Sequence, residues 1–437
     1  MRLLYVLRKK ERKILLSRLE KNNNEMNQLL GNISWLEPAR RKRRSEMPTL
    51  YGKFRRQAIS LHKAIICSLR CNCSSTHSSK LLLADTEQTT STREESSSTG
   101  FLKLRIYFPR QSRLWSGVPS VMTPEHDWYA SEITMAKTIQ NSVPCASYNR
   151  GMPSQTRHSL NLSVQSISSI NDNKIHNLCH TLNQSDRATS CLGYLMDEEY
   201  HHIISRSTRD HVLPRSTRKI ATLGDLIRKQ NEDKVFSAIT EPILCREERL
   251  RLALRMTKAL LQLYSSPWLS RTWCKDDIYF FEDKSGNVRF DVPFLVTNFE
   301  PSASASTSAE KPTKPQKASL SPAKSEEYES TRLTLLSLGI LILELYFNKS
   351  IESCPWLGNY LGPNGYKNEY TIFNTAITWQ KQALEEGGID LHNVTSCCIF
   401  GSFGMPMQDL GDRELQSAVH SNVIEPLERM LARFKLS

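Results

Sequence analysis

The sequence contains no uninterrupted apolar run long enough to cross a membrane. Its most apolar segment, 333–347, is shorter than the ~20 residues that a membrane-spanning helix needs, and it contains Glu344. The early apolar run 3–7 is also too short for the core of a secretory signal peptide. We therefore expect an intracellular protein, cytoplasmic or nuclear, without a transmembrane segment, in which 333–347 is a buried helix.

Regularly spaced cysteines are absent as well. The 11 cysteines are scattered along 437 residues, which argues against a disulfide framework and favours reduced thiols. The segment Cys71-Asn-Cys73-x₃-His77 suggests a zinc site, but only three ligands are local and no partner pair is evident. We expect a strand entry with buried thiols there, and neither a metal nor a cofactor.

Acidic residues are scarce near the N-terminus. Residues 1–70 hold 18 Lys and Arg against 5 Asp and Glu, and the rest of the chain holds 40 of each, so the net charge of +13 belongs to this segment. Its densest basic run predicts a nuclear address or a patch that binds nucleic acid or an acidic membrane. A solvated turn between two helices explains the run equally well. The run comprises Arg40, Arg41, Lys42, Arg43 and Arg44.

Apolar residues in 3–36 recur at helical spacing. Pro38 and the basic run interrupt that pattern, and Pro48 opens a second helical stretch that carries Phe54 and Leu61 on its apolar face. Proline lacks a main-chain donor and kinks or ends a helix. The sequence therefore predicts a basic helical hairpin at 1–70 as a domain of its own.

Residues 71–221 predict a reduced β-containing region. Segments 80–85 and 101–108 are rich in β-favouring residues, and 192–196 and 201–205 flank a polar turn, as in a hairpin. Residues 109–173 are rich in Ser, Asn and Thr with little periodicity, so we expect a disordered insertion there.

From residue 222 to 437 the pattern becomes mainly helical. Short β-favouring runs at 278–281 and 288–290 predict a pair of strands, and the Ser- and Pro-rich residues 301–325 predict a flexible loop. Helical spacing predicts helices at 223–229, 246–264, 333–347, 373–386 and 412–435, the last interrupted at Pro426.

Four segments in this region follow the order found in protein kinases. They are TLGDLIRK (222–229), LLQLYSSPWLSRTWCKDDIYFF (260–281), DVPFLVTNF (291–299) and TLLSLGILILELYFNKS (334–350). In turn, they resemble the segment after the kinase hinge, the catalytic loop, the strand with the Asp-Phe-Gly metal site, and the helix reading Asp-x-Trp-Ser-Leu-Gly-x-x-x-x-Glu-Leu. The resemblance implies an α+β fold, a two-lobed protein-kinase-like domain with a mainly helical C-terminal lobe.

The residues that perform kinase chemistry are nevertheless replaced. A threonine occupies the place of the proton acceptor, and losing a positioned base alone costs ~10² to 10⁴ in rate. The sequence also lacks a Gly-x-Gly-x-x-Gly loop and a recognisable Val-Ala-x-Lys strand, and it has Thr334 where kinases have an aspartate that braces the catalytic loop. We therefore expect no catalytic residue and no enzymatic activity. The degenerate positions are Ser270, Arg271, Thr272, Cys274 and Asp277.

Three carboxylates remain near this loop. Asp276, Asp277 and Asp291 leave open the binding of a metal ion or nucleotide, because carboxylates ligate hard cations. A divergent active kinase would depend on them. The competing interpretation is that Asp276 and Asp277 cap a turn and face water.

Further motifs extend over most of the chain: EPARRKRR (37–44), CNCSSTHSSKLLL (71–83), CLGYLMDEE (191–199), LSLGILILELYFNKSIE (336–352) and VIEPLE (423–428). With TLGDLI and the loop segment, they make the chain similar to a fungal family of uncharacterised proteins with a C-terminal kinase-like domain of unknown function. Some members carry a helical N-terminal region like that of fungal prion-inhibition (HeLo-like) proteins, much of which we expect this chain to lack. The resemblance implies a pseudokinase that binds a protein partner, in fungal signalling or self-recognition.

Overall fold

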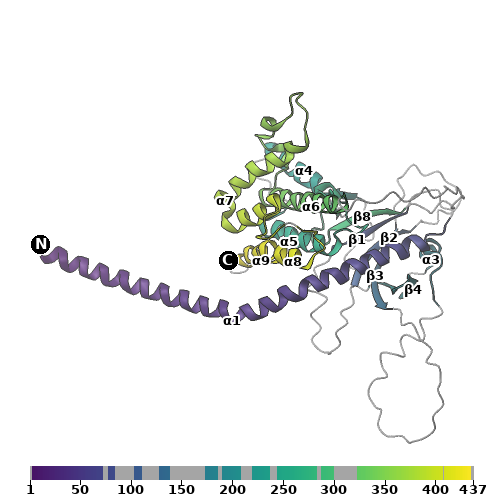
Figure 1. Cartoon of the computed structure of the whole chain (residues 1–437), viewed down its shortest axis with the longest axis horizontal. Coiled ribbons are helices and arrows are strands. Elements are labelled where there is room, and N and C mark those ends of the chain that lie inside the picture. Colours follow the sequence, from purple (N-terminus) through teal and green to yellow (C-terminus); the bar gives the residue numbers. More distant parts are fainter. Residues whose placement is uncertain are drawn as a thin grey trace, which may run out of the picture. The chain divides into compact units, whose positions relative to one another are not determined.

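The computed structural model divides the chain into two compact units, Met1–Leu50 and Tyr51–Ser437. One helix, α1 (Arg2–Ser68), contributes to both units (Figure 1). The residues that the structure describes are 2–71, 77–83, 103–110, 127–137, 173–185, 189–207, 219–236, 244–282, 287–299, 322–406 and 408–434.

The helical hairpin predicted for 1–70 is wrong, because α1 continues through Pro38 and Pro48 without a turn. A proline removes one main-chain hydrogen bond, yet a helix with sound turns on both sides tolerates this as a kink. Just after the first proline, Arg41 Nε lies 3.2 Å from Glu37 Oε1, and such i,i+4 pairs support a helix. The basic run therefore lies on a continuous helix.

The last turns of α1 belong to the core of the second unit. Tyr51, Ala58, Leu61 and Ile65 are fully buried, and their spacing places them on one helical face. The first domain therefore ends at Leu50, because the residues that follow supply core side chains to the second unit. The predicted boundary at residue 70 is wrong.

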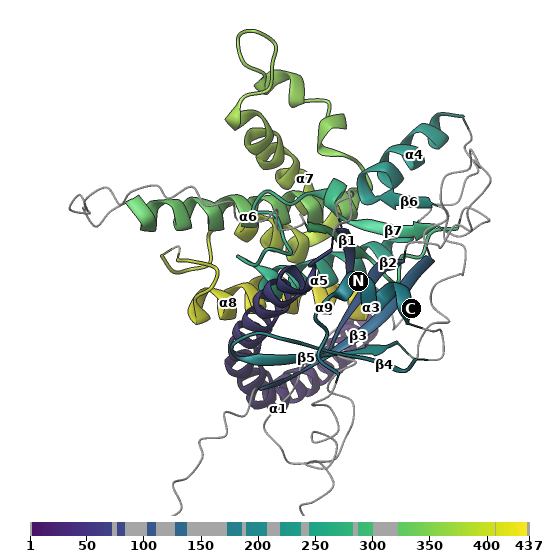
Figure 2. The ribbon, with the colours of Figure 1, turned by 90° about the vertical axis from the view of Figure 1, so that its right-hand side faces the viewer.

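An eight-stranded antiparallel sheet lies in the second unit, in the order β4-β5-β3-β2-β1-β8-β7-β6. Figure 2 shows strands β2 to β5 running alongside one another. The strands are β1 (His77–Leu82), β2 (Lys103–Arg110), β3 (Asp127–Lys137), β4 (Cys191–Met196), β5 (Tyr200–Arg206), β6 (Lys219–Thr222), β7 (Tyr279–Glu282) and β8 (Phe294–Phe299).

The β4–β5 hairpin confirms the strand pair predicted at 192–196 and 201–205. The carboxylate of Asp197 closes its turn by accepting the main-chain N–H of Tyr200 over 2.7 Å. Strand β3, in contrast, lies inside the predicted disordered insertion and was missed. Its buried side chains alternate with less buried ones, as in a sheet with one face toward the core. Most of the predicted insertion, and 301–321 of the predicted flexible loop, lie outside the described residues.

The sheet crosses the boundary predicted between 71–221 and 222–437. Strand β8 pairs with β1 over its whole length, from His77↔Phe299 to Leu82↔Phe294, and β6 pairs with β7. The predicted division is therefore wrong for the sheet. The strands after the loop are apolar, and they complete the sheet by pairing with strands from the earlier region.

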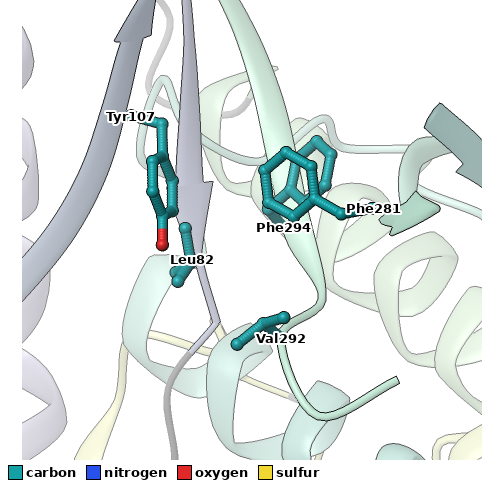
Figure 3. Close-up of a cluster of buried hydrophobic side chains, with 5 residues drawn as sticks. All are labelled: Leu82, Tyr107, Phe281, Val292 and Phe294. Atoms are coloured by element: carbon teal, nitrogen blue, oxygen red, sulfur yellow. The ribbon is translucent and has the colours of Figure 1, made fainter. Parts of the chain in front are cut away.

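Core side chains from both predicted regions meet in one cluster. Figure 3 shows the rings of Phe281 and Phe294 next to each other, with Val292 below them and Tyr107 and Leu82 on the neighbouring strands. The centroids of the two phenylalanine rings lie 4.4 Å apart. Such a shared cluster joins the strands on either side of residue 222 into a single core.

Helices α4 to α9 lie to the left of β8 in Figure 1, where α6 packs against α5 and α7, whereas α3 lies beside β2. The helices predicted at 223–229, 246–264 and 333–347 are confirmed, although the first and the third extend beyond the predicted bounds. The helix predicted at 373–386 is the part of α7 that precedes the non-helical backbone of Gly388 (φ 74°). Pro426 does not interrupt the last helical run; it stands at the start of α9, directly after the π-helical turn His420–Ile424. The helices are α3 (Leu178–Gln184), α4 (Leu223–Phe236), α5 (Arg246–Leu263), α6 (Pro322–Phe347), α7 (Glu369–Phe400), α8 (Arg413–Val419) and α9 (Glu425–Arg433). A π-helical turn, η6 (His420–Ile424), joins α8 to α9, and three 3₁₀ turns are η3 (Lys275–Asp277), η4 (Ile351–Ser353) and η5 (Leu357–Tyr360).

One described helical stretch, Tyr328–Phe347 in α6, has the length and apolar composition of a membrane span, and 67% of its apolar window is buried inside the molecule. Such burial is also found in the core helices of globular proteins.

Candidate functional site

The loop between α5 and β7 carries the positions that resemble a kinase catalytic loop. Ser270, Arg271, Thr272 and Cys274 are exposed, whereas the side chain of Trp273 is buried between them. An indole is a large apolar group, and its burial fixes the path of the loop. The buried indole of Trp273 therefore holds the loop from within.

Helix α6 holds the middle of this loop. Thr334 is buried, and its hydroxyl donates a hydrogen bond to the main-chain carbonyl of Arg271 over 3.2 Å. The loss of the brace, which we inferred from the replacement of an aspartate by threonine, is therefore wrong. A shorter side chain makes the contact between the same two elements.

A buried ion-pair network holds the end of the loop. Lys275 Nζ lies 2.8 Å from Glu344 Oε1 on α6 and 2.9 Å from Glu352 Oε2. Glu344 also accepts the main-chain N–H of Ile351 over 2.9 Å. Lys275 and Glu344 are almost completely buried, and a buried charge requires such compensation. The one carboxylate in the apolar segment 333–347 therefore has a structural partner.

The pKa values in this network move in different directions. Burial raises the pKa of Glu344, although the pairing with Lys275 offsets part of that effect. For Glu352, burial also acts to raise the pKa, but hydrogen bonds from Lys275 and Ser350 outweigh it and bring the pKa to about 2. Burial acts to lower the pKa of Lys275, and attraction to Glu344 reverses this and raises it. Lys275 is thus a buried structural cation.

Asp277 and Asp276 serve the local structure of the loop. The carboxylate of Asp277 accepts the main-chain N–H of Cys274 over 2.8 Å, which closes the 3₁₀ turn η3. Asp276 pairs with Arg228 on α4 at 3.4 Å. A Cβ atom at Gly224 would lie 2.0 Å from Asp276 Oδ1, so the glycine of TLGDLI permits the close approach of α4 to the loop.

Asp291 lies in the turn before β8, where kinases place their Asp-Phe-Gly aspartate. Arg289 donates to both of its carboxylate oxygens, over 2.9 and 2.7 Å. These hydrogen bonds hold the pKa of Asp291 below its ordinary value. The main-chain carbonyl of Asp291 accepts from Arg255 of α5 over 2.9 Å. The carboxylate is therefore already occupied by an arginine.

The predicted carboxylate group does not assemble into a compact site. Among the described residues, Asp276, Asp277 and Asp291 are not in any set of three ligand atoms that lie within 4.8 Å of one another. Each is instead engaged by a main-chain N–H or an arginine. The interpretation that Asp277 caps a turn fits its hydrogen bond to Cys274.

Two pockets adjoin these elements. The first, of about 510 Å³, opens at the start of the loop and includes Ser270, Arg271 and Thr334 in its lining; Thr272, Cys274 and Asp277 lie outside it. The second, of about 810 Å³, lies between α4, β6 and β7, and Asp225 and Lys229 of TLGDLIRK line it. The structure therefore places Ser270 and Arg271 in the lining of the first pocket, while Thr272, Cys274 and Asp277 line neither pocket.

Lys80 is a buried cation of the sheet that was not predicted from the sequence. Its Nζ lies 3.5 Å from the ring centroid of Trp128, and the rings of Phe281 and Phe294 lie within 5.2 Å. Burial lowers the pKa of Lys80 to about 7. Aromatic faces attract a cation, so these rings provide the electrostatic contact for the ammonium group. A lysine within an apolar β-favouring run was the available signal in the sequence.

The basic run lies on α1 in the first unit. Glu37 pairs with Arg41 at 3.2 Å and with Arg44 at 3.6 Å, and Lys42 lies 3.9 Å from Glu46. Part of the positive charge is therefore balanced within the helix itself. Exposed pairs of this kind contribute little to stability.

A family model described as a domain of unknown function (DUF7580) matches residues 48–360. The chain belongs to this family. The matched range of the DUF7580 domain begins at the last turns of α1 and ends in η5, so it contains the whole sheet, the loop after α5 and helix α6. No curated protein matches the chain.

Solved structures similar to the DUF7580 chain include kinases and pseudokinases. One is the pseudokinase domain of BIR2, an immune regulator of the RLK/Pelle family, with 12% identity, 70% of this chain and 74% of that one covered, and a TM-score of 0.25. Another is a Neurospora crassa complex of PAN2 with the pseudokinase and C-terminal parts of PAN3, with 11% identity, coverages of 87% and 70%, and a TM-score of 0.28. Vaccinia related kinase 3 gives 13% identity, coverages of 80% and 95%, and a TM-score of 0.26.

Proposed function

We propose that this chain is a two-lobed kinase-like protein without phosphotransfer activity, which acts inside the cell by binding a protein partner. The proposed lack of phosphotransfer activity rests mainly on the position of Lys275. It is the one lysine of the degenerate loop, and it is buried against Glu344 and Glu352 instead of being presented at the surface.

The surroundings of the other loop residues support the same proposal. Phosphoryl transfer needs a base for the substrate hydroxyl and carboxylates or amides that hold magnesium against the phosphates. Thr272 is exposed and has a hydroxyl where the base should be. Asp277 closes a turn, and Asp291 is paired with Arg289. Each group that remains is engaged in holding the local structure.

Lys80 adds an independent reason. A kinase uses a lysine of its N-terminal sheet, paired with a carboxylate, to orient the phosphates. Lys80 stands on β1 next to β8, but its ammonium group faces the ring of Trp128. Among the described residues, no carboxylate acts on its pKa, which burial alone lowers. A lysine packed in this way against aromatic rings is not placed to hold a nucleotide.

The partner-binding part rests on the first unit. On α1, the apolar side chains of Ile14, Leu15, Leu16 and Leu19 are 54–58% exposed. Clustered exposed apolar groups mark sites of association. Residues 1–50 also hold 13 Lys and Arg against 5 Asp and Glu. The partner that fits this chemistry is a protein with an apolar surface and an acidic rim. The nine described cysteines are all free thiols, which accords with an intracellular setting.

The test of inactivity is phosphotransfer from labelled ATP with magnesium, to the chain itself and to generic substrates, beside a thermal-shift titration with magnesium-ATP. We expect neither transfer nor a shift in Tm. Transfer that disappears in Asp277→Ala would establish the rival assignment, a divergent active kinase. The control is Glu385→Ala, since Glu385 is an exposed residue of α7 that lies outside the loop and outside both pockets.

A second measurement separates a protein partner from the other alternative for the basic run. DNA, RNA and vesicles with anionic lipids are tested with the full chain and with a variant that has Gln at Arg40, Arg41, Lys42, Arg43 and Arg44. Binding that weakens steeply with salt and is lost in the variant would assign the run to nucleic acid or acidic membranes. We expect no such binding.

A further inference from the structure

Two cysteines and a histidine from three separate segments converge at the start of strand β1. Cys71 follows the end of α1, His77 begins β1, and Cys179 lies in the first turn of α3. Cys71 Sγ and His77 Nε2 are 2.8 Å apart. The two sulfur atoms and a ring nitrogen of His77 all lie within 4.8 Å of one another, and all three residues are partly buried.

Local structure fixes each of the three segments. Asn177 caps α3 by accepting the main-chain N–H of His180 over 3.1 Å. Its amide also donates to the carbonyl of Arg70 over 2.7 Å. One side chain thus joins the start of α3 to the residue before Cys71. His77 is held from the other side, because it is paired in register with Phe299 of β8.

We propose that Cys71, His77 and Cys179 bind a zinc ion, with a water molecule or another exogenous ligand in a fourth position. Two thiolates and an imidazole are the donor types that zinc prefers, at about 2.3 Å for sulfur and about 2.0 Å for nitrogen. In a tetrahedron with those bond lengths, the ligand atoms lie about 3.5 to 3.8 Å apart. The observed 4.8 Å limit accommodates such a shell, and the Cys71–His77 pair needs to open by about 0.7 Å.

The surroundings of Cys179 fit this assignment. The amide of Asn183, one helical turn later on α3, lies 3.7 Å from Cys179 Sγ and is oriented as a donor. Metal-bound thiolates and imidazoles are commonly hydrogen-bonded from outside the ligand shell, and removal of such a group costs 10–100-fold in affinity. A simple thiol–imidazole hydrogen bond would account for Cys71 and His77, but it gives no reason for Cys179 to join them.

The proposal departs from the expectation that this segment holds no metal. In the sequence, the motif Cys71-Asn-Cys73-x₃-His77 offered only local ligands, and Cys73 lies outside the described residues. The third described donor comes from more than 100 positions farther along the chain, on a short helix that the sequence did not predict. A bound ion at this place would join the end of α1, the first strand and α3.

The experiment uses tag-free full-length protein, reduced and stripped of metal, titrated with Zn²⁺ against a chromophoric chelator and with Co²⁺ in an absorption spectrometer. We expect one equivalent of either ion, and for cobalt the near-ultraviolet thiolate charge-transfer band together with the visible bands of a tetrahedral ion. Cys71→Ser, His77→Ala and Cys179→Ser should each weaken zinc affinity at least about a hundredfold, more than removal of an outer hydrogen bond does.

Matched controls separate the site from general thiol binding. Cys67→Ser and Cys191→Ser change exposed cysteines elsewhere and should leave affinity and spectra unchanged. Asn183→Ala should weaken binding about tenfold and keeps the readout available if a ligand variant fails to fold, as judged by circular dichroism. The proposal is overturned if the wild type takes up no stoichiometric metal, if the ligand variants bind like the controls, or if mass spectrometry shows a disulfide between Cys71 and Cys179 in the protein isolated under reducing conditions.

Discussion

Lys275 and Glu344 form an ion pair of 2.8 Å in the interior of the protein, 69 positions apart in the chain. The pair connects the turn η3 to the last turn of helix α6. With the hydrogen bond from Thr334 to Arg271, it fixes the middle and the end of the loop after α5. The loop is therefore held on α6 through Arg271 and Lys275.

Replacing Lys275 with Met is expected to destabilise the protein by about 3–5 kcal/mol, because Glu344 is left buried without its partner. The double variant Lys275→Met, Glu344→Leu removes both charges and should recover much of that loss. Urea unfolding followed by tryptophan fluorescence measures both. Lys349→Met, at an exposed position just after α6, is the control and should change stability little. A double variant less stable than the single one would contradict the pairing.

Lys80 makes the free energy of unfolding depend on pH in the neutral to alkaline range. Burial lowers its folded-state pKa to about 7, against 10.5 for an ordinary lysine. Between these values the unfolded chain binds more protons than the folded one, so the free energy of unfolding rises with pH in this window. Lys80→Met should remove the rise and stabilise the protein at pH 7 by about 2–3 kcal/mol, after the loss of the contact with Trp128 is subtracted.

The control for Lys80 is Lys103→Met on the neighbouring strand β2. The side chain of Lys103 is 55% exposed and pairs with Glu132 at 3.0 Å. An exposed pair contributes at most about 1 kcal/mol. Unfolding at pH values from 7 to 10 distinguishes the two variants. If both show the wild-type pH dependence, Lys80 is charged in the folded state and the assignment of its environment is wrong.

His202 makes the stability of the protein depend on pH in the acidic range. It is fully buried on β5, with Ser60 Oγ 2.8 Å from its Nε2, and burial lowers its pKa to about 4, with Asp197 opposing and His201 adding to the shift. The unfolded state binds the extra proton between pH 6.5 and 4, so stability falls as pH decreases through that range.

Replacing His202 with Gln should remove about 2 kcal/mol of this pH dependence over the measured range. The difference between variant and wild type is measured from pH 6.5 to 4.5, above the range in which most carboxylates titrate. His176→Gln, at an exposed position before α3, provides the comparison and should follow the wild type. A wild-type slope in His202→Gln would show that another group carries the dependence.

The two ends of α1 should respond differently to the same mutation. Leu61 is fully buried and Leu19 is 58% exposed. Leu61→Ala is expected to cost about 3–4 kcal/mol, because it removes apolar contacts and leaves a cavity. Leu19→Ala should stay within about 0.5 kcal/mol. Urea unfolding compares them, and equal effects would mean that the first unit is packed in solution.

Local sequence patterns were sufficient to predict those elements whose hydrogen bonds and apolar contacts join residues that are close in the sequence. Helix α5 and the β4–β5 hairpin have the predicted bounds to within two residues, because 3.6-residue periodicity and a polar turn act over a few positions. The order of the four kinase-like segments likewise indicates that the loop lies beside the helix at 333–347, and Thr334 of that helix does contact Arg271.

Other features depended on partners that are distant in the chain. The sequence by itself determined the charge asymmetry, the departures of the loop residues from the kinase motif and most helices. Only the tertiary structure decided that α1 continues past its prolines, that β8 pairs with β1, that Lys275 is buried against Glu344, and that Cys179 joins Cys71 and His77. The physical reason is that local propensity fixes the elements, whereas burial of apolar faces and compensation of buried charge select which elements meet.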